Sequence, residues 1–176
     1  MALLDPDVVR GYLAADDEMP AAIKWAKIHG LEHSWDQETL TFTLRLTGPN
    51  GAESTEHYLL VGTFEDYRVL PPTWRFVDPR NGTDIGQPAY PQPGPFPNGS
   101  VLHTNGVICA PWSRLAYKDR GGPHSDWTDA TAWQTTARDR TVADRIPDML
   151  ARVLAEVKLS PGRLAPLPPA SEQEAA

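Results

Sequence analysis

One thiol stands out among the side chains that could do chemistry. Cys109 is the only cysteine in the chain, and it follows a His-Thr-Asn-Gly segment at residues 103–106. A cysteine in such a setting can be a catalytic nucleophile or a metal ligand. More often it is a small buried hydrophobic residue, and Ile108 and Ala110 on either side favour that role. The residue alone leaves the three roles open.

A metal site would need more ligands than this thiol. Cys109, His103 and His124 could together form an open zinc site, but their spacing matches no zinc pattern. A single cysteine also excludes an internal disulfide and any zinc site with two or more thiolates, and it agrees with a reducing compartment. We therefore expect no metal at the thiol.

Composition and charge exclude other classes of function. A chain of 176 residues with 40% hydrophobic residues can fill the core of one domain. The net charge of −7, with acids and bases interspersed, argues against a nonspecific binder of nucleic acids or anionic membranes. No apolar run approaches the roughly 18 residues of a membrane-spanning helix, and the N-terminus does not resemble a secretory signal. We expect a soluble, cytoplasmic protein without nucleic-acid or membrane partners.

The elements that must position the thiol begin with a helix. Asp5 can cap this helix and Pro6 suits its first position. Residues 21–30 could form a second helix or a buried strand, because their apolar pattern fits both. The inward-facing residues of the first helix would be Val9, Tyr12 and Leu13.

Three predicted strands follow. Residues 39–47 alternate strictly between apolar side chains and Thr or Arg, as in a strand with one buried face. Turn residues at 48–51 lead to a second strand at 57–64, so the two strands should form an antiparallel hairpin. A third strand at 73–77 comes after two prolines. A helix followed by three consecutive strands predicts a β-meander in an α+β domain.

The rest of the domain is a long loop and a final helix. Residues 78–106 hold six prolines and several glycines, and loops of this length are usually functional or disordered. Apolar spacing predicts a helix at 144–158 with Asp144 as its N-cap. Residues 160–176 are rich in Pro, Ala and Glu, which predicts an extended or disordered tail after a domain at 1–159. The inward stripe of the final helix would be Ile146, Met149, Leu150, Val153, Leu154 and Val157.

Several short motifs occur in a fixed order along this framework. The run FEDYRVLPPTWRF at 64–76 carries a tyrosine, then Pro-Pro, then an apolar-basic-Phe strand. His103-Thr104-Asn105, Ile108-Cys109 and Trp127-Thr128 follow. With the order of helix, meander, cysteine-bearing loop and helix, these motifs resemble the ubiquitin-conjugating enzyme family over about residues 5–158. That family has a four-stranded antiparallel meander and one catalytic cysteine on a long loop.

Three departures point to a divergent branch of that family. Arg68 replaces the proline that follows the tyrosine in the family. The gap from His103 to Cys109 is shorter than usual, and the segment from Cys109 to Trp127 is longer. The longer segment resembles the divergent bacterial members better than the eukaryotic ones. Those bacterial relatives occur with a ubiquitin-like protein, an activating enzyme and a metalloprotease-type deconjugase, and some serve in antiphage defence.

The resemblance implies a specific activity. Cys109 would accept the C-terminal acyl group of a ubiquitin-like protein from an activating enzyme and hold it as a thioester. A lysine amine on a target protein would then attack the thioester, with no cofactor at this step. The alternative is a noncatalytic relative that binds a ubiquitin-like protein or a peptide. Such variants usually lack the cysteine, so its presence counts against this alternative.

The resemblance also suggests residues that assist Cys109. Asn105 could donate its side-chain N–H to the oxyanion, or it could be a turn residue that tolerates positive φ. His124 could act as acid or base, because imidazole titrates near physiological pH. Asp126 could orient His124 or lower the pKa of the attacking lysine, although an exposed turn aspartate is commoner. His103 is expected to be a hydrogen-bonded structural residue.

Overall fold

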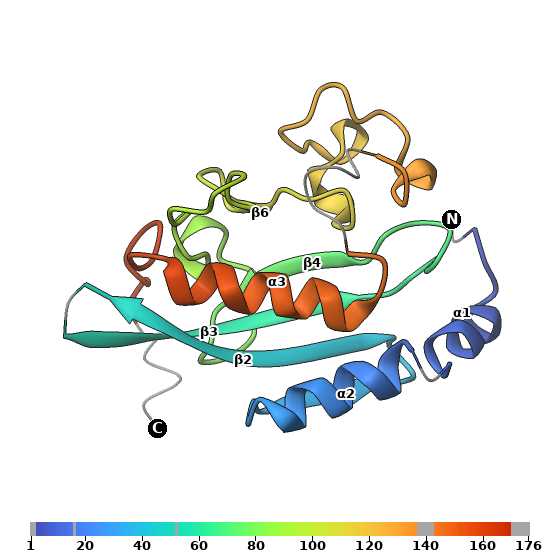
Figure 1. Cartoon of the computed structure of the whole chain (residues 1–176), viewed down its shortest axis with the longest axis horizontal. Helices are drawn as coiled ribbons and strands as arrows, with labels where there is room; N and C mark the ends of the chain where they lie inside the picture. Colours follow the sequence, from blue (N-terminus) through green and yellow to red (C-terminus); the bar gives the residue numbers. More distant parts are fainter. Residues whose placement is uncertain (1–2, 16, 52, 137–142, 170–176) are drawn as a thin grey trace.

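The computed structural model describes residues 3–15, 17–51, 53–136 and 143–169 (Figure 1). Over these residues the chain has an α+β fold with three α-helices and a four-stranded antiparallel sheet. Short 3-10 turns and a two-stranded hairpin lie in the long segment between the sheet and the last helix. The elements are α1 (Pro6–Leu13), α2 (Met19–Ile28), β1 (His33–Asp36), β2 (Thr41–Asn50), β3 (Ser54–Thr63), β4 (Thr73–Val77), η1 (Gln87–Ala89), β5 (Leu102–His103), β6 (Val107–Ile108), η2 (Arg114–Ala116), η3 (Lys118–Arg120), η4 (Ala130–Ala132) and α3 (Ile146–Leu159).

Helix α1 begins where the sequence predicts it. The Asp5 carboxylate accepts a hydrogen bond from the backbone N–H of the second helical residue at 2.8 Å, and a proline opens the helix. Val9 and Leu13 are buried as predicted. Tyr12 is 47% exposed, so its predicted inward position is wrong. The reason is that α1 lies at one end of the sheet (Figure 1), and only Val9 and Leu13 of this helix are buried.

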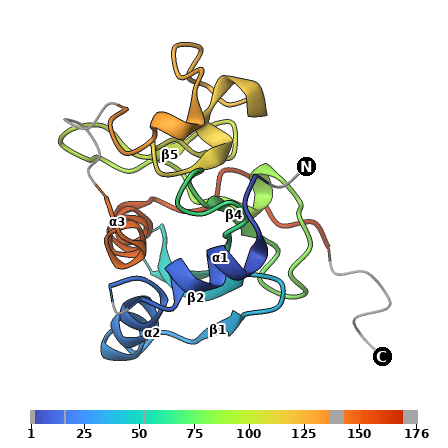
Figure 2. The ribbon, with the colours of Figure 1, turned by 90° about the vertical axis from the view of Figure 1, so that its right-hand side faces the viewer.

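Residues 21–30, for which the apolar pattern allowed either a helix or a buried strand, lie mostly in helix α2. Residues 21–28 belong to this helix, which has a proline in its first turn. Ala22 and Ala26 are fully buried. Figure 2 shows α2 and α3 side by side on one face of the sheet, and the two helices contact each other. Small side chains on α2 permit this close approach.

The sheet is a meander in which each strand pairs antiparallel with the next, in the order β1-β2-β3-β4. The predicted hairpin and third strand are confirmed as β2, β3 and β4. The sequence does not indicate β1, because its four residues contain one large apolar side chain, Trp35. This strand depends on pairing with the free edge of β2.

The β2–β3 hairpin is longer than its turn residues predict. β2 continues through Gly48 and Pro49 to Asn50, and β3 begins at Ser54. A Cβ atom at Gly48 would lie 2.6 Å from the carbonyl oxygen of Val157 on α3. This glycine therefore marks a close approach between strand and helix and not a turn.

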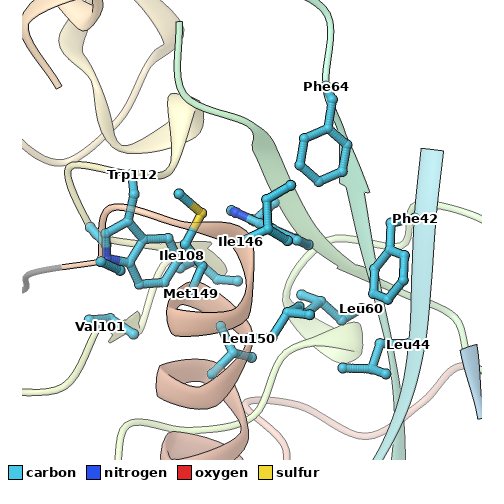
Figure 3. Close-up of a cluster of buried hydrophobic side chains, with 14 of the residues drawn as sticks. Phe42, Leu44, Leu60, Phe64, Val101, Ile108, Trp112, Ile146, Met149 and Leu150 are labelled. Carbon is cyan, nitrogen blue, oxygen red and sulfur yellow. The ribbon is translucent and has the colours of Figure 1, made fainter. Parts of the chain in front are cut away.

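Helix α3 joins two parts of the core. The predicted final helix is confirmed, and its whole predicted inward stripe is buried. Figure 3 shows Ile146, Met149 and Leu150 between the sheet and the segment that carries Val101 and Ile108. The helix thus contacts the sheet on one side and the cysteine-bearing segment on the other. None of the helices in the described part of the chain is long and apolar enough to span a membrane.

The N-cap of α3 is one residue later than predicted. The carbonyl of Arg145, not that of Asp144, accepts the first hydrogen bonds, from the N–H groups of Asp148 and Met149. Arg145 makes no side-chain capping hydrogen bond, so the cap carries no side-chain signal that the sequence could display.

Residues 160–169, for which the sequence predicts an extended or disordered tail, form no helix or strand but are fixed to the body of the molecule. The side chain of Arg163 is 5% exposed, and its Nε donates to the carboxylate of Glu56 at 2.7 Å. Its other nitrogens donate to three backbone carbonyls, and its guanidinium lies over the ring of Tyr58. One buried arginine thereby fixes a proline-rich segment that has little apolar surface of its own. Residues 170–176 lie outside the described residues.

Candidate active site

Cys109 lies at the end of a small hairpin. The hairpin consists of β5 and β6, and Cys109 follows β6 directly. The backbone N–H of Cys109 donates to the carbonyl of Val101 at 2.6 Å, which extends the ladder by one residue. Its neighbours Ile108 and Ala110 are fully buried, whereas Cys109 is only partly buried. The cysteine therefore borders the surface and does not fill the core.

The carboxylate of Glu156 fixes the strand beside Cys109. Glu156 lies on α3, is fully buried, and accepts hydrogen bonds from the N–H of Val101 at 3.0 Å and the hydroxyl of Ser100 at 2.5 Å. Arg152, one turn earlier on α3, donates to the same carboxylate at 2.9 Å. Because Val101 also accepts the hydrogen bond from Cys109, α3 sets the position of the cysteine backbone through one intermediate residue.

The surroundings of Cys109 raise the pKa of its thiol to about 11. Burial is the larger cause, because it disfavours the charged thiolate, and the negative charge of Asp126 adds to it. The resting thiol is therefore protonated at neutral pH. The thiolate of such a group is intrinsically a strong nucleophile, but the proton must first be removed.

Asn105 lies in the turn of the hairpin. Its side-chain oxygen is 2.7 Å from Nδ1 of His103, so His103 is hydrogen-bonded within the turn. Gly106 takes the positive φ, at 77°, and Asn105 does not need one. Two residue pairs separate the turn from Cys109, which is roughly 10 Å along the strand at about 3.3 Å per residue. The structure therefore does not bring Asn105 to the thiol.

His124 and Asp126 come from the segment after Cys109. The ring of His124 stacks on Trp127 with the centroids 3.6 Å apart and the planes 7° apart, which fixes the orientation of the imidazole. Its Nδ1 is 3.6 Å from the Asp126 carboxylate, and 29% of the His124 side chain is exposed. Asp126 is also close enough to Cys109 to raise the pKa of the thiol. Asp126 thus acts on the Cys109 thiol through its charge and contacts His124.

Two positioning residues are not recognisable in the sequence. In the sequence, Glu156 cannot be distinguished from an exposed acid on the polar side of a helix, although the next residue, Val157, belongs to the apolar stripe. Arg114 resembles a surface arginine, yet its guanidinium is buried and donates to the carbonyls of Pro71 and Glu65. This arginine ties the segment after the cysteine to the connection between β3 and β4. The one sequence feature that could have indicated the burial of Arg114 is the apolar character of its neighbours, which are buried in the structure.

The candidate site residues do not form a metal site. Across the ranges of the chain that the structure describes, no three His, Cys, Asp or Glu side chains come together so as to hold a metal ion. The zinc site considered from Cys109, His103 and His124 is not formed, and His103 is instead hydrogen-bonded to Asn105.

No protein-family model, curated protein or solved structure matches the chain. The chemistry available to the site therefore follows from its own geometry. A partly exposed thiol of high pKa lies at the end of a hairpin that α3 holds, and the charge of Asp126, which contacts His124, acts on it. Such a group can hold an acyl chain as a thioester and release it to an amine.

Proposed function

We propose that the chain carries a ubiquitin-like protein as a thioester on Cys109 and transfers it to a lysine of a target protein. The resemblance to the divergent bacterial conjugating enzymes suggests this reaction, with an activating enzyme as the donor and antiphage defence as one setting. The observation that carries the proposal is the order of elements around a single partly exposed thiol. Two helices, a four-stranded meander, a long cysteine-bearing segment and a helix follow one another, an order similar to that of the family except for the second N-terminal helix.

The strand connection that carries the main motif also supports the proposal. The FEDYRVLPPTWRF run joins β3 to β4, and its Tyr67 is fully buried, with the hydroxyl donating to Glu18 at 2.8 Å. Its Pro71 carbonyl accepts from Arg114 at 3.0 Å. The motif thus contacts the start of α2 through Tyr67 and the segment after Cys109 through Pro71.

The chemistry of the thiol fits a carrier of acyl groups. In the first step the Cys109 thiolate attacks the thioester carbonyl of the donor, and the donor thiolate leaves and takes a proton. In the second step a lysine amine attacks, the C–S bond to Cys109 breaks, and the amine proton returns to the sulfur or to a base. A thiol with a raised pKa leaves slowly, so the thioester would resist water until an amine is well placed.

Asp126 and His124 would act on the attacking amine. A carboxylate stabilises an ammonium ion and so raises the pKa of a nearby lysine, which is opposite to the lowering that the sequence suggested for Asp126. The role that remains for Asp126 is to attract and orient the lysine. His124, stacked on Trp127 and partly exposed, is the available base for the amine proton.

A charging assay tests the proposal. A ubiquitin-like protein is supplied either by its activating enzyme with ATP or as a preformed mercaptoethanesulfonate thioester, which removes the need for the activating enzyme. We expect an adduct on the wild-type chain that thiols cleave and that free lysine discharges. Intact mass measurement would locate one added acyl group per chain.

Variants of Cys109 give the controls. Cys109→Ser should form an ester that hydroxylamine cleaves and thiols do not, and Cys109→Ala should form neither. A thiol-cleavable adduct on the alanine variant would refute the assignment. A noncovalent complex without any adduct would instead favour the binding-module alternative.

A further inference from the structure

A groove on the outer face of the sheet is lined by three arginines. Its floor is the surface of β3 and β4 that faces away from α3, where Thr63, Thr73 and Arg75 lie on neighbouring strands. One wall contains Arg114 and Arg120, from the segment with η2 and η3, and the loop after β4 forms the other. Its volume is about 520 Å³, which is within the range of small-molecule sites.

Two of these arginines make few strong contacts with the protein. The guanidinium of Arg75 contacts Asp84 at 3.4 Å, and its Nε is enclosed without a hydrogen-bond partner. Arg120 contacts its neighbour Asp119, also at 3.4 Å. Arg163, by contrast, has a carboxylate at 2.7 Å and three backbone carbonyls. A buried guanidinium donor without a partner, such as the Nε of Arg75, is costly, and an anion with several oxygens would satisfy it.

The third arginine adds charge to the same wall. Burial lowers the pKa of Arg114, the carboxylates of Asp66 and Glu65 act in the opposite direction, and the charge of Arg120 lowers it further. The two cations are therefore close enough to repel each other. The lining contains three arginines and two acids, Glu65 and Asp84, and the carboxylates of Asp119 and Asp66 act on Arg120 and Arg114 from just outside it.

We propose that this groove binds a phosphomonoester, a small molecule with a terminal phosphate and a polar remainder. Arg75 and Arg120 bind the phosphate through the paired N–H donors that match its oxygens. The hydroxyls of Thr63 and Thr73 add neutral donors on the floor. Glu65 and Asp84 accept hydrogen bonds from the hydroxyl or amine groups of the remainder. This site is independent of the thioester chemistry of Cys109.

Calorimetric titration of the full chain tests the site with three probes. AMP carries a phosphomonoester, adenosine lacks the phosphate, and inorganic phosphate lacks the remainder. At 100 mM salt we expect AMP to bind, inorganic phosphate to bind more weakly, and adenosine not to bind. Arg75→Gln and Arg120→Gln should each weaken AMP binding about tenfold or more, because each removes a charge-assisted contact.

Arg145→Gln is the matched control. Arg145 is exposed to the same degree as Arg120, 48% against 49%, and also makes one ion pair at 3.4 Å, but it lies outside the groove. We expect this variant to bind AMP like the wild type. Equal losses in all three variants, adenosine binding as tight as AMP binding, or no AMP binding to the wild type would each overturn the proposal.

A measurement on the wild type covers the case in which a groove variant does not fold. In amide-resolved NMR spectra, AMP should shift the signals of Thr63, Arg75 and Arg120 and leave that of Arg145 in place. Shifts confined to residues outside the groove would contradict the site.

Discussion

At the scale of single residues, the surroundings of Cys109 keep its thiol protonated at neutral pH. Burial and the charge of Asp126 both disfavour the thiolate, and both depend on the closed hairpin and the segment that follows it. A docking partner that covers Asp126 or brings a cation would change this balance. The rate at which the Cys109 thiol of the chain alone reacts with an alkylating reagent therefore measures this balance in the absence of a partner.

We expect Cys109 in the folded chain to react with iodoacetamide about tenfold more slowly at pH 7.5 than the same cysteine in the urea-unfolded chain. The rise in pKa from 9.0 to about 11 lowers the thiolate population roughly a hundredfold, and the stronger nucleophilicity recovers about tenfold. The logarithm of the rate should rise steadily to pH 10. Mass spectrometry of quenched samples measures it, and a plateau below pH 9 would contradict the prediction.

Replacement of Asp126 should move this pH profile. Asp126→Asn removes the smaller cause of the raised pKa, so the profile shifts to lower pH but stays above that of the unfolded chain. Asp119→Asn is the control, because it removes an exposed charge from the same segment that does not act on the thiol. Equal profiles for the wild type and Asp126→Asn would exclude this electrostatic effect.

At the scale of elements, α3 connects the sheet to the cysteine. Glu156→Ala would leave the N–H of Val101, the hydroxyl of Ser100 and the charge of Arg152 without their buried partner. We expect the free energy of unfolding to fall by about 3 kcal/mol, the typical cost of breaking a buried pair. Urea unfolding measures this loss.

Hydrogen exchange separates a local role for Glu156 from general destabilisation. The amide of Cys109 should exchange faster in Glu156→Ala than the loss of global stability explains, because its acceptor Val101 is released. Asp148→Asn, which removes an exposed ion pair at the start of the same helix, should cost less than about 1 kcal/mol. An unchanged Cys109 amide would show that α3 does not position the hairpin.

The contact between β3 and β4 gives another test at this scale. A Cβ atom at Gly62 would lie 2.3 Å from the ring of Trp74, its cross-strand partner in the core. Gly62→Ala should therefore destabilise the fold by about 1–3 kcal/mol through overpacking. Gly11→Ala, on α1 with no atom within 4 Å of the new Cβ, should instead stabilise it by about 0.5–1 kcal/mol. Thermal or urea unfolding distinguishes these opposite signs.

Elements with local signals could be predicted from the sequence. β2, β3, β4 and α3 each carry their own apolar periodicity, and the Asp5 cap of α1 is a local hydrogen bond. β1 could not be predicted, because its four residues depend on the edge of β2. The packing of residues 160–169 depends on the hydrogen bond from Arg163 to Glu56, which is far away in the sequence. The composition of the segment cannot predict such a contact.

The candidate site divides in the same way. Cys109, His124 and Asp126 are recognisable by residue type, and in the structure Asp126 contacts His124 and acts on the Cys109 thiol through its charge. The separation of Asn105 from the thiol is set by the register of the β5–β6 hairpin, which four strand residues do not reveal. The roles of Glu156 and Arg114 depend on burial by distant segments, so their sequence neighbours could not indicate them.

At the scale of the whole molecule, the buried carboxylate of Glu18 connects three segments: the start of α2, the β3–β4 connection and the start of α3. Glu18 precedes α2, accepts from the hydroxyl of Tyr67 at 2.8 Å and from the N–H of Ile146 at 3.4 Å, and its carboxylate is 3.5 Å from Arg68. Burial raises its pKa above 4.5, although Tyr67 and Arg68 oppose this rise. The folded state therefore favours the protonated acid more than the unfolded state does.

Because the pKa of Glu18 is higher in the folded state than in the unfolded state, the free energy of unfolding depends on pH. A raised folded-state pKa contributes stability that is fully present below pH 4.5 and is lost as pH rises through the folded-state value. Relative to the wild type, the permanently neutral Glu18→Gln should gain stability as pH increases from 4.5, until the wild-type acid is ionised. Urea unfolding from pH 4 to 8 measures the difference, with exposed Glu38→Gln as the control for loss of a charge. A difference that falls with pH would contradict the assignment.

The long stretch of sequence between the last strand of the sheet and helix α3, which packs on it, has a consequence for folding during synthesis. The sheet is complete at Val77, but α3 begins only at Ile146. A ribosome adding about 5–20 residues per second needs roughly 3–14 seconds for the intervening segment. During that time the apolar face with Phe42, Leu44 and Leu60 lacks the helix that later packs on it. The nascent chain is thus a natural client for chaperones that bind exposed apolar strands, and it completes its fold only after α3 has left the ribosome.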